Sequence, residues 1–406
     1  MRIQLWSYHY PPELLGIGPI AGVLASGLAE RGHEVTVITA HPNYPEPIWG
    51  TRLRPYRQRH GAVDVLRLPL YARSRGAAGR LARELTYTAS TATTMGLLPP
   101  ADVVVAASPS LAALLPAMVA ARGRGVPWVL WLQDRVAEAA ATIGLLPPQL
   151  TRPAARFERF AYRSADRVVA ISSVFRRQLI DEGVAPSKID LIHNPASSSA
   201  RAKVATNGAG HGPRLLSIGN MGHSHGLAEL VAELDQAEVL SRADADWVIT
   251  GTGVTQDEVR AAIKGPRVKL AGLVPADDLA AELDAASLAL VGQRADIREF
   301  NLPSRVMTLM AHGVPVVAAC DPRSELAQVI EASGGGWVAD RRRRGATAEV
   351  VHGALSSPDE CATRGAAARV YAAENFNPDL FVERFERSIR VAIEGDPAAH
   401  TAGRSR

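Results

Sequence analysis

The stretch Glu299–Glu325, EFNLPSRVMTLMAHGVPVVAACDPRSE, holds the pattern that decides the fold of this chain. A Pro-Ser pair and a basic residue open a short helix, Gly313-Val314-Pro315 ends it, and the apolar run that follows is typical of a buried strand. Such a helix begins with free backbone N–H groups and the positive end of its dipole, and both favour a phosphate. Arg305, one turn inside the helix, could add a charged clamp. Two interpretations stay open: a diphosphate-binding turn, or a plain helix–turn–strand unit of an α/β domain.

The same alternation of short apolar runs and amphipathic segments extends over most of the chain. Strands rich in Val, Ile and Leu that are joined by helices predict a parallel sheet with both faces covered. A first series of strands is expected at residues 2–7, 34–39, 63–68, 102–106, 128–132 and 167–171. A second series is expected at residues 214–218, 246–250, 267–271, 287–291 and 314–319.

Residues 196–212, ASSSARAKVATNGAGHG, separate the two series and have the small, polar composition of a linker. The expected fold class is therefore α/β, with two Rossmann-like, doubly wound domains that face one another across a cleft. The first domain would span residues 1–195 and the second residues 213–376. An amphipathic helix at residues 377–396 would cross back to the first domain. In such sheets small ligands bind beyond the carboxyl ends of the strands.

Length and composition indicate a soluble, globular chain of two or three domains, because 406 residues exceed one ordinary core and 47% are hydrophobic against 21% charged. The two cysteines, Cys320 and Cys361, exclude a disulfide framework and suggest a reducing cytoplasm. The N-terminus lacks the charge and apolar order of a signal peptide. Prolines and Asp102 interrupt the most apolar region, residues 95–121, which argues against a membrane span. The eleven histidines are scattered, and no metal-ligand cluster is evident.

The net charge of +4 is unevenly placed, because residues 1–200 hold 22 Lys or Arg against 14 Asp or Glu. One interpretation is a solubilising, arginine-rich face. The other is attraction to an anionic membrane surface or a phosphorylated acceptor. Nucleic acid is not expected as a partner, since no aromatic stacking pattern accompanies the arginines. Much of the excess lies in Arg52, Arg54, Arg57, Arg59, Arg73, Arg75, Arg80 and Arg83.

The first strand is followed by Gly16-Ile17-Gly18-Pro19, which opens the first helix. These glycines would let the backbone approach a phosphate or a sugar. They do not form a dinucleotide fingerprint, because the third glycine, Gly22, falls one position late and no acid ends the second strand. A nicotinamide dehydrogenase is therefore disfavoured. A purely structural glycine turn remains the alternative.

A second glycine-rich turn, Gly219–Gly226, follows the first strand of the second domain. Its backbone N–H groups, Asn220 and His225 could bond a diphosphate or the sugar beyond it. Leu273 and Val274 follow the end of another strand, where backbone groups could contact the edge of a nucleobase. The turn at residues 251–253 is expected to be structural.

Asp134 ends the apolar run at residues 128–132 and would lie at the mouth of the cleft. Its carboxylate could bind or orient an acceptor hydroxyl, or act as a base. The alternative is a helix N-cap for the segment that follows. Spacing alone does not decide between the two.

Several short motifs occur together over nearly the whole chain. The first half holds Tyr10-Pro11-Pro12-Glu13, residues 31–39 (RGHEVTVIT) and residues 41–45 (HPNYP), and the second half holds residues 219–222, 302–305 and 311–318. In this combination the chain resembles the family-4 glycosyltransferases of the two-domain GT-B fold. The likeness is strongest to bacterial polysaccharide enzymes, the fucosyl and N-acetylfucosaminyl transferases.

The resemblance implies transfer of a sugar from a nucleotide-diphosphate donor, UDP- or GDP-linked, with retention of the anomeric configuration. The donor would bind to the second domain, and the acceptor, a small glycoside or a polyprenyl-diphosphate-linked sugar, to the first. Arg305 matches a basic residue that holds the diphosphate, Glu325 a carboxylate near the donor ribose or sugar, and Asp134 a polar residue at the reaction centre. In the front-face mechanism commonly invoked, the donor phosphate helps deprotonate the acceptor and no metal is required. Such an enzyme is cytoplasmic, or peripheral on the inner face of the plasma membrane.

The chain departs from the family pattern at the donor site. Many members carry two glutamates eight positions apart, where this chain has Phe300, beside Glu299, and Thr308. Many also carry an arginine and a lysine in the second glycine turn, where this chain has Asn220 and His225. Two other functions thus stay open: a sugar-nucleotide-binding subunit without catalysis, and a sugar-nucleotide epimerase on the same fold. The predicted donor-binding residues are Gly16, Gly18, Gly219, Asn220, His225, Leu273, Val274, Arg294, Arg298, Pro303, Ser304 and Thr308, with Arg294 or Arg298 as the source of the missing charge.

Overall fold

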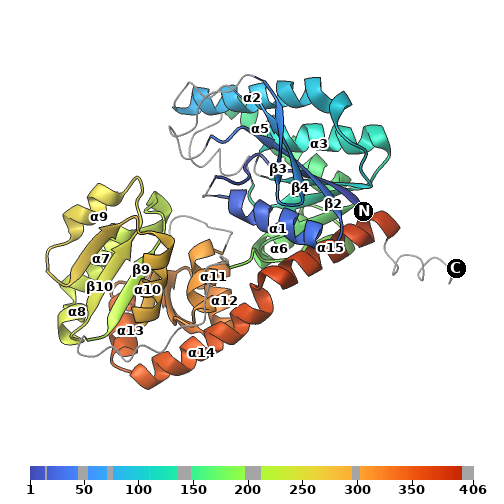
Figure 1. The fold of residues 1–406 in the computed structure, drawn as a ribbon. Coiled ribbons are helices and arrows are strands. Elements are labelled where there is room, and N and C mark those ends of the chain that lie inside the picture. The colour runs from blue at the N-terminus through green and yellow to red at the C-terminus, as the bar shows by residue number, and fades with distance from the viewer. Residues whose placement is uncertain are drawn as a thin grey trace. The chain divides into compact units, whose positions relative to one another are not determined.

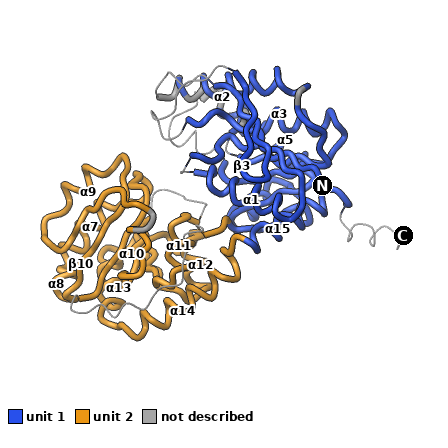
Figure 2. The backbone as a smooth tube through the Cα atoms, in the orientation of Figure 1, with its two compact units in different colours: residues 1–193, 379–406 blue, residues 194–378 orange. Residues whose placement is uncertain are grey.

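The chain forms two compact α/β units (Figure 2). Unit 1 consists of Met1–His193 together with Asp379–Arg406, and unit 2 of Asn194–Pro378. The chain therefore passes from unit 1 into unit 2 and back again. The computed structural model describes residues 1–13, 16–43, 54–70, 76–108, 110–135, 148–196, 212–294 and 302–395.

Unit 1 is built on an eight-stranded sheet in the order β3-β4-β2-β1-β5-β6-β7-β8 (Figure 1). Each neighbouring pair is parallel except β3 with β4. Successive strands are added on one side of β1 and then, from β5, on the other, so β1 and β5 flank the point where ligands bind in open α/β sheets. The strands are β1 Arg2–Trp6, β2 Glu34–Ala40, β3 Tyr56–His60, β4 Val63–Leu68, β5 Val103–Ala107, β6 Trp128–Leu132, β7 Arg167–Ala170 and β8 Ile189–Leu191.

The helices of unit 1 cover this sheet (Figure 1). They are α1 Gly18–Glu30, α2 Gly76–Thr94, α3 Leu111–Arg124, α5 Pro148–Ser164, α6 Ser173–Asp181 and α15 Pro378–Glu394. The strand β3 was not expected, because its sequence YRQRH is polar and its side chains are mostly exposed. It exists as an edge strand through its antiparallel pairing with β4.

Unit 2 is built on a six-stranded parallel sheet in the order β11-β10-β9-β12-β13-β14. The strands are β9 Arg214–Ile218, β10 Asp246–Thr250, β11 Val268–Gly272, β12 Leu288–Gly292, β13 Val316–Cys320 and β14 Gly336–Asp340. The helices are α7 Leu227–Gln236, α8 Val239–Arg242, α9 Gln256–Ala262, α10 Ala276–Ala285, α11 Ser304–Ala311, α12 Glu325–Ser333, α13 Ala346–Leu355 and α14 Pro358–Asn375.

Two hydrophobic cores lie on the opposite faces of this sheet. Val316 and Ala318 of β13 belong to the core that includes α11, α12 and α14, whereas Val317 and Ala319 belong to the core with α7 and α13. Successive side chains of a strand point to opposite faces, so a strand buried on both sides must be apolar throughout. This requirement explains the uninterrupted apolar run in the stretch quoted first.

The strand β14 was not expected from the sequence. It begins at Gly336, where a Cβ would lie 1.9 Å from the carbonyl oxygen of its partner Val316. Only glycine permits this approach, and the short run GWVAD that it begins lacks the continuous apolar pattern of a strand buried on both faces.

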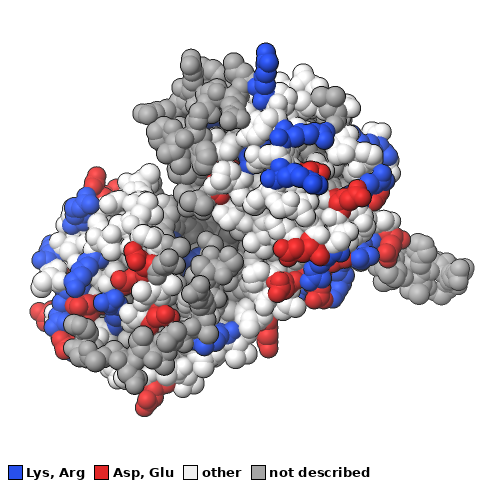
Figure 3. All heavy atoms as spheres, in the orientation of Figure 1, with Lys and Arg blue, Asp and Glu red and all other residues white. Residues whose placement is uncertain are grey.

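The helix α15 packs on unit 1 although it follows unit 2 in the chain (Figure 1). Trp131 of β6 lies with ring-centroid distances of 5.9 Å from Phe381 and 5.3 Å from Phe385. A Cβ on Gly27 of α1 would lie 2.6 Å from Cγ2 of Val382. Positive and negative side chains are mixed around this helix (Figure 3). Both α1 and β6 thus present surfaces that α15 covers.

The expected domain boundaries differ from the two units by a few residues. Residues 194–196 and 377–378 group with unit 2. The N–H of Ala196 donates to Phe376 O at 2.8 Å and fixes the start of the predicted linker there. Most of that linker, residues 197–211, lies outside the described residues. Within the described parts of the chain, no helix is both long enough and apolar enough to cross a membrane.

Candidate functional site

The turn after β9 lies against the turn after β10 in unit 2. The N–H of Gly219 donates to Thr250 O at 3.0 Å. A Cβ on Gly251 would lie 1.9 Å from Gly219 O, and one on Gly253 would lie 2.4 Å from Met221 O. Gly219 itself has a φ of 104°, a conformation that favours glycine. These glycines hold the backbone of the turn at the carboxyl ends of the strands.

Arg305 reaches this turn from α11. Its Nη1 lies 3.3 Å from Nε2 and 3.5 Å from Nδ1 of His225, and its Nη2 donates to Gly292 O at 3.4 Å. Its Cδ lies 3.6 Å from the position that a Cβ on Gly219 would take. The N-cap of α11 is Pro303, which provides no side-chain acceptor for the first N–H groups. The start of α11 and the turn after β9 therefore meet.

The ring of His225 is held as a neutral hydrogen-bond donor. The N–H of Gly222 donates to Nδ1 at 3.1 Å, so Nδ1 is unprotonated and Nε2 bears the proton. Burial, and then the charge of Arg305, lower the pKa of His225 to about 4. The imidazole is therefore uncharged near neutral pH and offers an N–H beside the guanidinium group.

Two further arginines approach the same turn. A Cβ on Gly226 would lie 2.9 Å from Cγ of Arg294 and 3.0 Å from Nη2 of Arg341. The N–H of Arg294 donates to Ser224 O at 2.8 Å, and its side chain pairs with Glu229 at 3.4 Å. Sequence reasoning missed Arg341, because it did not recognise β14, the strand that Arg341 follows. Recognition of that strand would have placed Arg341 at the carboxyl edge of the sheet.

Glu325 and Thr308 have buried side chains in the same unit, 2% and 8% exposed. Glu325 is the first residue of α12, where the helix dipole favours a carboxylate. Burial, and then the charge of Glu325, raise the pKa of Tyr371 on α14. Ser304, the first residue of α11, is exposed. Glu325 is therefore a fixed negative group close to the start of a helix.

Two other predicted residues, Leu273 and Val274, are not brought into this cluster. Leu273 and Val274 follow β11, the edge strand two places from β9, and Leu273 is 76% exposed. Asn220 is exposed on the turn itself. Arg298 lies outside the described residues.

In unit 1, the glycines before and inside α1 allow tight packing of the turn that follows β1. A Cβ on Gly18 would lie 3.0 Å from Glu13 O, and one on Gly22 would lie 2.7 Å from Cγ of Pro11. Gly16 has open space around it but a φ of 68°, which favours glycine. This packing gives a structural reason for glycine at position 18, in addition to its predicted contact with a ligand.

Asp134 follows β6 at the carboxyl edge of unit 1. Its backbone N–H donates to Oγ of Ser108 at 3.2 Å, and Oγ of Ser108 donates to its carbonyl oxygen at 3.0 Å. The N–H of Arg135 donates to its carboxylate at 2.8 Å. Burial raises the pKa of Asp134, which suits a group that exchanges a proton. The alternative role as an N-cap concerns residues 136–147, which lie outside the described residues.

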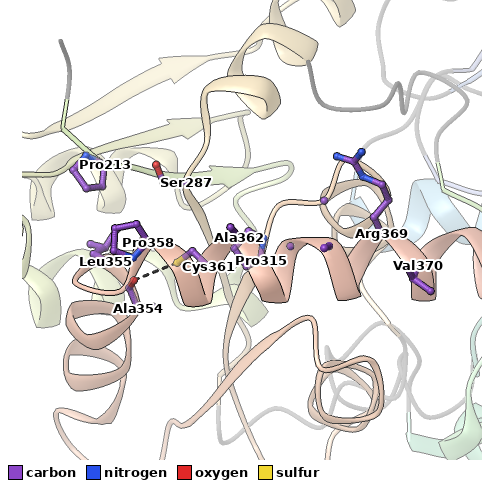
Figure 4. A pocket seen from close by; sticks show the side chains of 13 residues that line it. Pro213, Ser287, Pro315, Ala354, Leu355, Pro358, Cys361, Ala362, Arg369 and Val370 are labelled. Atoms are coloured by element: carbon purple, nitrogen blue, oxygen red, sulfur yellow. Dashed lines mark hydrogen bonds between the residues drawn. The ribbon is translucent and has the colours of Figure 1, made fainter. Parts of the chain in front are cut away.

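A cavity of about 680 Å³ in unit 2 lies elsewhere (Figure 4). Its lining includes Pro213, Ser287 and Pro315, which directly precede β9, β12 and β13, and Arg369 of α14. These positions mark the amino ends of the strands. The cavity is thus on the opposite edge of the sheet from Arg305 and is not the predicted donor site.

Two family models match the chain, one in each unit. The model for the glycosyl transferase 4-like domain matches residues 16–195, and the model for glycosyl transferases group 1 matches residues 212–357. A protein of Escherichia coli (strain K12) named "Putative colanic acid biosynthesis glycosyl transferase WcaI" is 28% identical over 357 residues, 82% of this chain and 86% of that protein.

Solved structures share the fold over nearly the full length. Sucrose-phosphate synthase (tll1590) from Thermosynechococcus elongatus superposes with a TM-score of 0.70 at 17% identity and covers 96% of this chain and 98% of its own. Anabaena Alr3699/HepE in complex with UDP-glucose gives 0.61 at 16% identity, with 96% and 99% covered. This likeness establishes the GT-B fold. With both units matched by their family models, the chain belongs to the group 1, family-4 glycosyltransferases.

Proposed function

We propose that this glycosyltransferase moves a sugar from a nucleotide-diphosphate donor to a lipid-linked or small glycoside acceptor, with retention of configuration, in the synthesis of a bacterial polysaccharide or glycoconjugate. The main support is the meeting of Arg305 with His225 at the start of α11. The UDP-glucose complex of HepE and the name of WcaI support the donor class and the polysaccharide context. The proposal does not single out fucose; a fucose donor is one of those to be tested in the donor screen.

The donor diphosphate binds at the turn after β9. Arg305 supplies a permanent positive charge, His225 a neutral N–H, and the start of α11 its backbone N–H groups. Arg294 and Arg341 supply further charge from the other side of the turn. Glu325 binds the ribose or the sugar by accepting hydrogen bonds from the hydroxyl groups of that ligand.

The costly event is departure of the nucleoside diphosphate. The bond between the anomeric carbon and the phosphate oxygen breaks, and the acceptor oxygen bonds to the same face of that carbon. The acceptor proton passes to the departing phosphate oxygen. Preorganised arginines stabilise the negative charge as it develops, with no need to be reoriented.

The acceptor binds to unit 1, where Asp134 and Ser108 lie at the carboxyl ends of β6 and β5. Burial raises the pKa of Asp134, which makes its carboxylate a better proton acceptor for a hydroxyl of the acceptor.

An anionic membrane surface is the proposed partner of unit 1 and places the enzyme on the inner face of the plasma membrane. Helix α5 exposes Arg152, Arg156 and Arg159 on one face, while its acidic residue Glu158 is buried. Phe160 on that face is 48% exposed, with Arg122 stacked over its ring at 5.1 Å. Basic groups with an exposed aromatic ring suit an anionic lipid surface. Among the arginines singled out in the sequence, Arg52, Arg73, Arg75 and the side chain of Arg80 lie outside the described part of the structure.

Liposome sedimentation tests the membrane contact. The triple change of Arg152, Arg156 and Arg159 to Gln should abolish salt-sensitive binding to vesicles that contain anionic lipid. The same change of Arg260, Arg323 and Arg343, which lie in unit 2, is the charge-matched control. Equal sedimentation of both triple variants would contradict the membrane proposal.

A donor screen tests the function itself. Release of nucleoside diphosphate is measured with UDP- and GDP-linked sugars, with and without an extracted polyprenyl-linked acceptor. Arg305→Ala should lower the rate on the order of a hundredfold, because one preorganised charge is lost. Arg260→Ala, an exposed arginine of α9, should leave the rate unchanged. No turnover of any donor, or an unaffected Arg305→Ala variant, would contradict the assignment.

A further inference from the structure

We propose that the cavity of about 680 Å³ in unit 2 is a second ligand site, which binds an unbranched aliphatic carboxylate with its anionic group on Arg369. The cavity lies at the amino ends of the strands, on the opposite edge of the sheet from Arg305. The inference therefore does not depend on the proposed sugar transfer, which concerns the other edge.

The cavity follows one face of α14 (Figure 4). Its lining positions on this helix begin at Pro358 and end at Val370, and they recur three and four residues apart, as positions on one side of a helix do. Between these two residues the helix advances roughly 18 Å, at about 1.5 Å per residue. The cavity is therefore elongated, which suits an extended chain better than a compact ring.

The wall of the cavity is mostly apolar. Ala362 and Ala366 line it from α14, and their small side chains leave the space open. Pro213, Pro315 and Leu355 line it from other elements. The lining contributed by the described residues contains no aspartate or glutamate. Such a wall favours a hydrocarbon chain, because burying that chain removes apolar surface from water.

Arg369 is the basic group of this otherwise apolar wall. Its Nη2 donates to the carbonyl oxygen of His312 at 3.1 Å, and its Nε is buried without an acceptor in the described part of the chain. A carbonyl oxygen carries no net charge, and Arg369 forms no ion pair with any carboxylate that the structure describes. A half-buried guanidinium group without a counterion is costly, so an anion in the cavity offsets that cost.

The single guanidinium group selects a carboxylate as this anion. Its planar array of N–H groups matches the two oxygens of a carboxylate, and one negative charge balances one positive charge. A phosphate dianion would bring an uncompensated charge into an apolar cavity. Together with the elongated wall, Arg369 therefore indicates a monocarboxylate with a straight hydrocarbon chain.

The cavity and the proposed donor site lie at opposite ends of α11. His312 is the C-cap of this eight-residue helix, and a Cβ on the following Gly313 would lie 2.8 Å from Nη2 of Arg369. Arg305 is the second residue of the same helix. The carboxylate and a nucleoside diphosphate thus have different contact residues, and both should bind at the same time.

Isothermal titration calorimetry of the full chain with hexanoate and decanoate, below their micelle concentrations, tests the site. Decanoate should bind saturably, with one site per chain, and more tightly than hexanoate because its longer chain leaves water. Decanol, which lacks the charge, should bind about 10- to 100-fold more weakly than decanoate. A saturating concentration of UDP or GDP should not displace decanoate.

Two pairs of variants locate the ligand. Arg369→Met should lower the affinity for decanoate about 10- to 100-fold, Arg369→Lys should retain part of it, and Arg260→Met, on α9, should leave it unchanged. Ala366→Trp should fill the cavity and abolish binding. Thr363→Trp places the same ring on an exposed position of α14 outside the lining and should bind decanoate normally.

The thiol of Cys361 supplies a readout inside the cavity. Cys361 lines the cavity and is 8% exposed, whereas Cys320, the other cysteine of the chain, is 0% exposed. Decanoate should slow the modification of Cys361 by methyl methanethiosulfonate, and the same concentration of decanol should not. Mass spectrometry of the peptides distinguishes the two cysteines.

Any of four results would overturn the inference. They are no saturable binding of decanoate, equal affinity for decanol, unchanged affinity in Arg369→Met, and an unprotected Cys361 in the presence of bound decanoate. Displacement of decanoate by UDP or GDP would place the carboxylate at the other edge of the sheet and contradict the inference as well. None of these measurements requires sugar transfer, so their failure leaves the proposed function intact, and a failed donor screen leaves this site intact.

Discussion

The proposed donor site in unit 2 collects its polar groups from four separate segments of the chain. His225 lies in the turn after β9, Arg294 follows β12, Arg305 is the second residue of α11 and Arg341 follows β14. Three guanidinium groups stay charged at any physiological pH, and the imidazole stays neutral. The site is therefore suited to a diphosphate whose charge increases during the reaction.

Arg341 gives a residue-scale prediction for donor binding. Arg341→Ala should raise the KM for the donor about 10- to 150-fold, because a charge-assisted contact to phosphate is worth about 1.5–3 kcal/mol. Arg343→Ala removes an exposed arginine of the same loop, paired with Glu349 at 2.7 Å, and should leave the KM unchanged. Steady-state kinetics with varied donor distinguish the two, and an equal KM in both variants would exclude Arg341 from the site.

His225 gives a prediction about pH. Burial lowers its pKa to about 4 in the folded protein, from an ordinary value of 6.5. Protonation therefore favours the unfolded chain, and the folded state loses stability as pH falls from about 6.5 toward 4. His225→Gln removes this term, so its free energy of unfolding should fall less than that of wild type between pH 7 and pH 5. Urea unfolding at both values measures the difference, and parallel losses would refute the assigned pKa shift.

At the scale of elements, the contact of α1 with α15 depends on the absence of a side chain. Gly27→Ala places a methyl group 2.6 Å from Val382 and should destabilise unit 1 by about 1–3 kcal/mol, although alanine is the better helix former. Gly123→Ala in α3 is the matched control, because no atom lies within 4 Å of the new Cβ. It should stabilise by about 0.5–1 kcal/mol. Urea unfolding should therefore give changes of opposite sign, and equal effects would contradict the close packing.

The sequence predicted the central strands because burial on both faces demands continuous apolar runs. It did not predict β3, which is polar and forms through its pairing with β4. It did not predict β14 either, which begins with a glycine because the backbone of Val316 lies so close. The turn after β9 and the start of α11 were predicted as one site, since each has a local signature. Arg341 has no such signature, because it follows a strand that the sequence did not reveal and only folding brings it to Gly226.

At the scale of the whole molecule, α15 completes unit 1 from the far end of the chain. Deletion of residues 378–406 should expose Trp131, which is 0% exposed in the folded protein. Unit 1 should then become sensitive to protease, while unit 2 keeps its affinity for nucleoside diphosphate. Limited proteolysis with mass spectrometry locates the cleavage sites, and a thermal shift with UDP or GDP reports on unit 2. Equal resistance of both units would show that α15 is dispensable.

The surface of β6 and α1 that α15 covers also has a consequence for biosynthesis. The ribosome must add all of unit 2 between the two portions of unit 1, which takes roughly 10 to 40 seconds at usual elongation rates. Throughout that interval the nascent chain displays the indole of Trp131 and the bare helix surface at Gly27. We expect molecular chaperones to bind this exposed apolar surface. Unit 2 should fold before α15 covers the surface and completes unit 1.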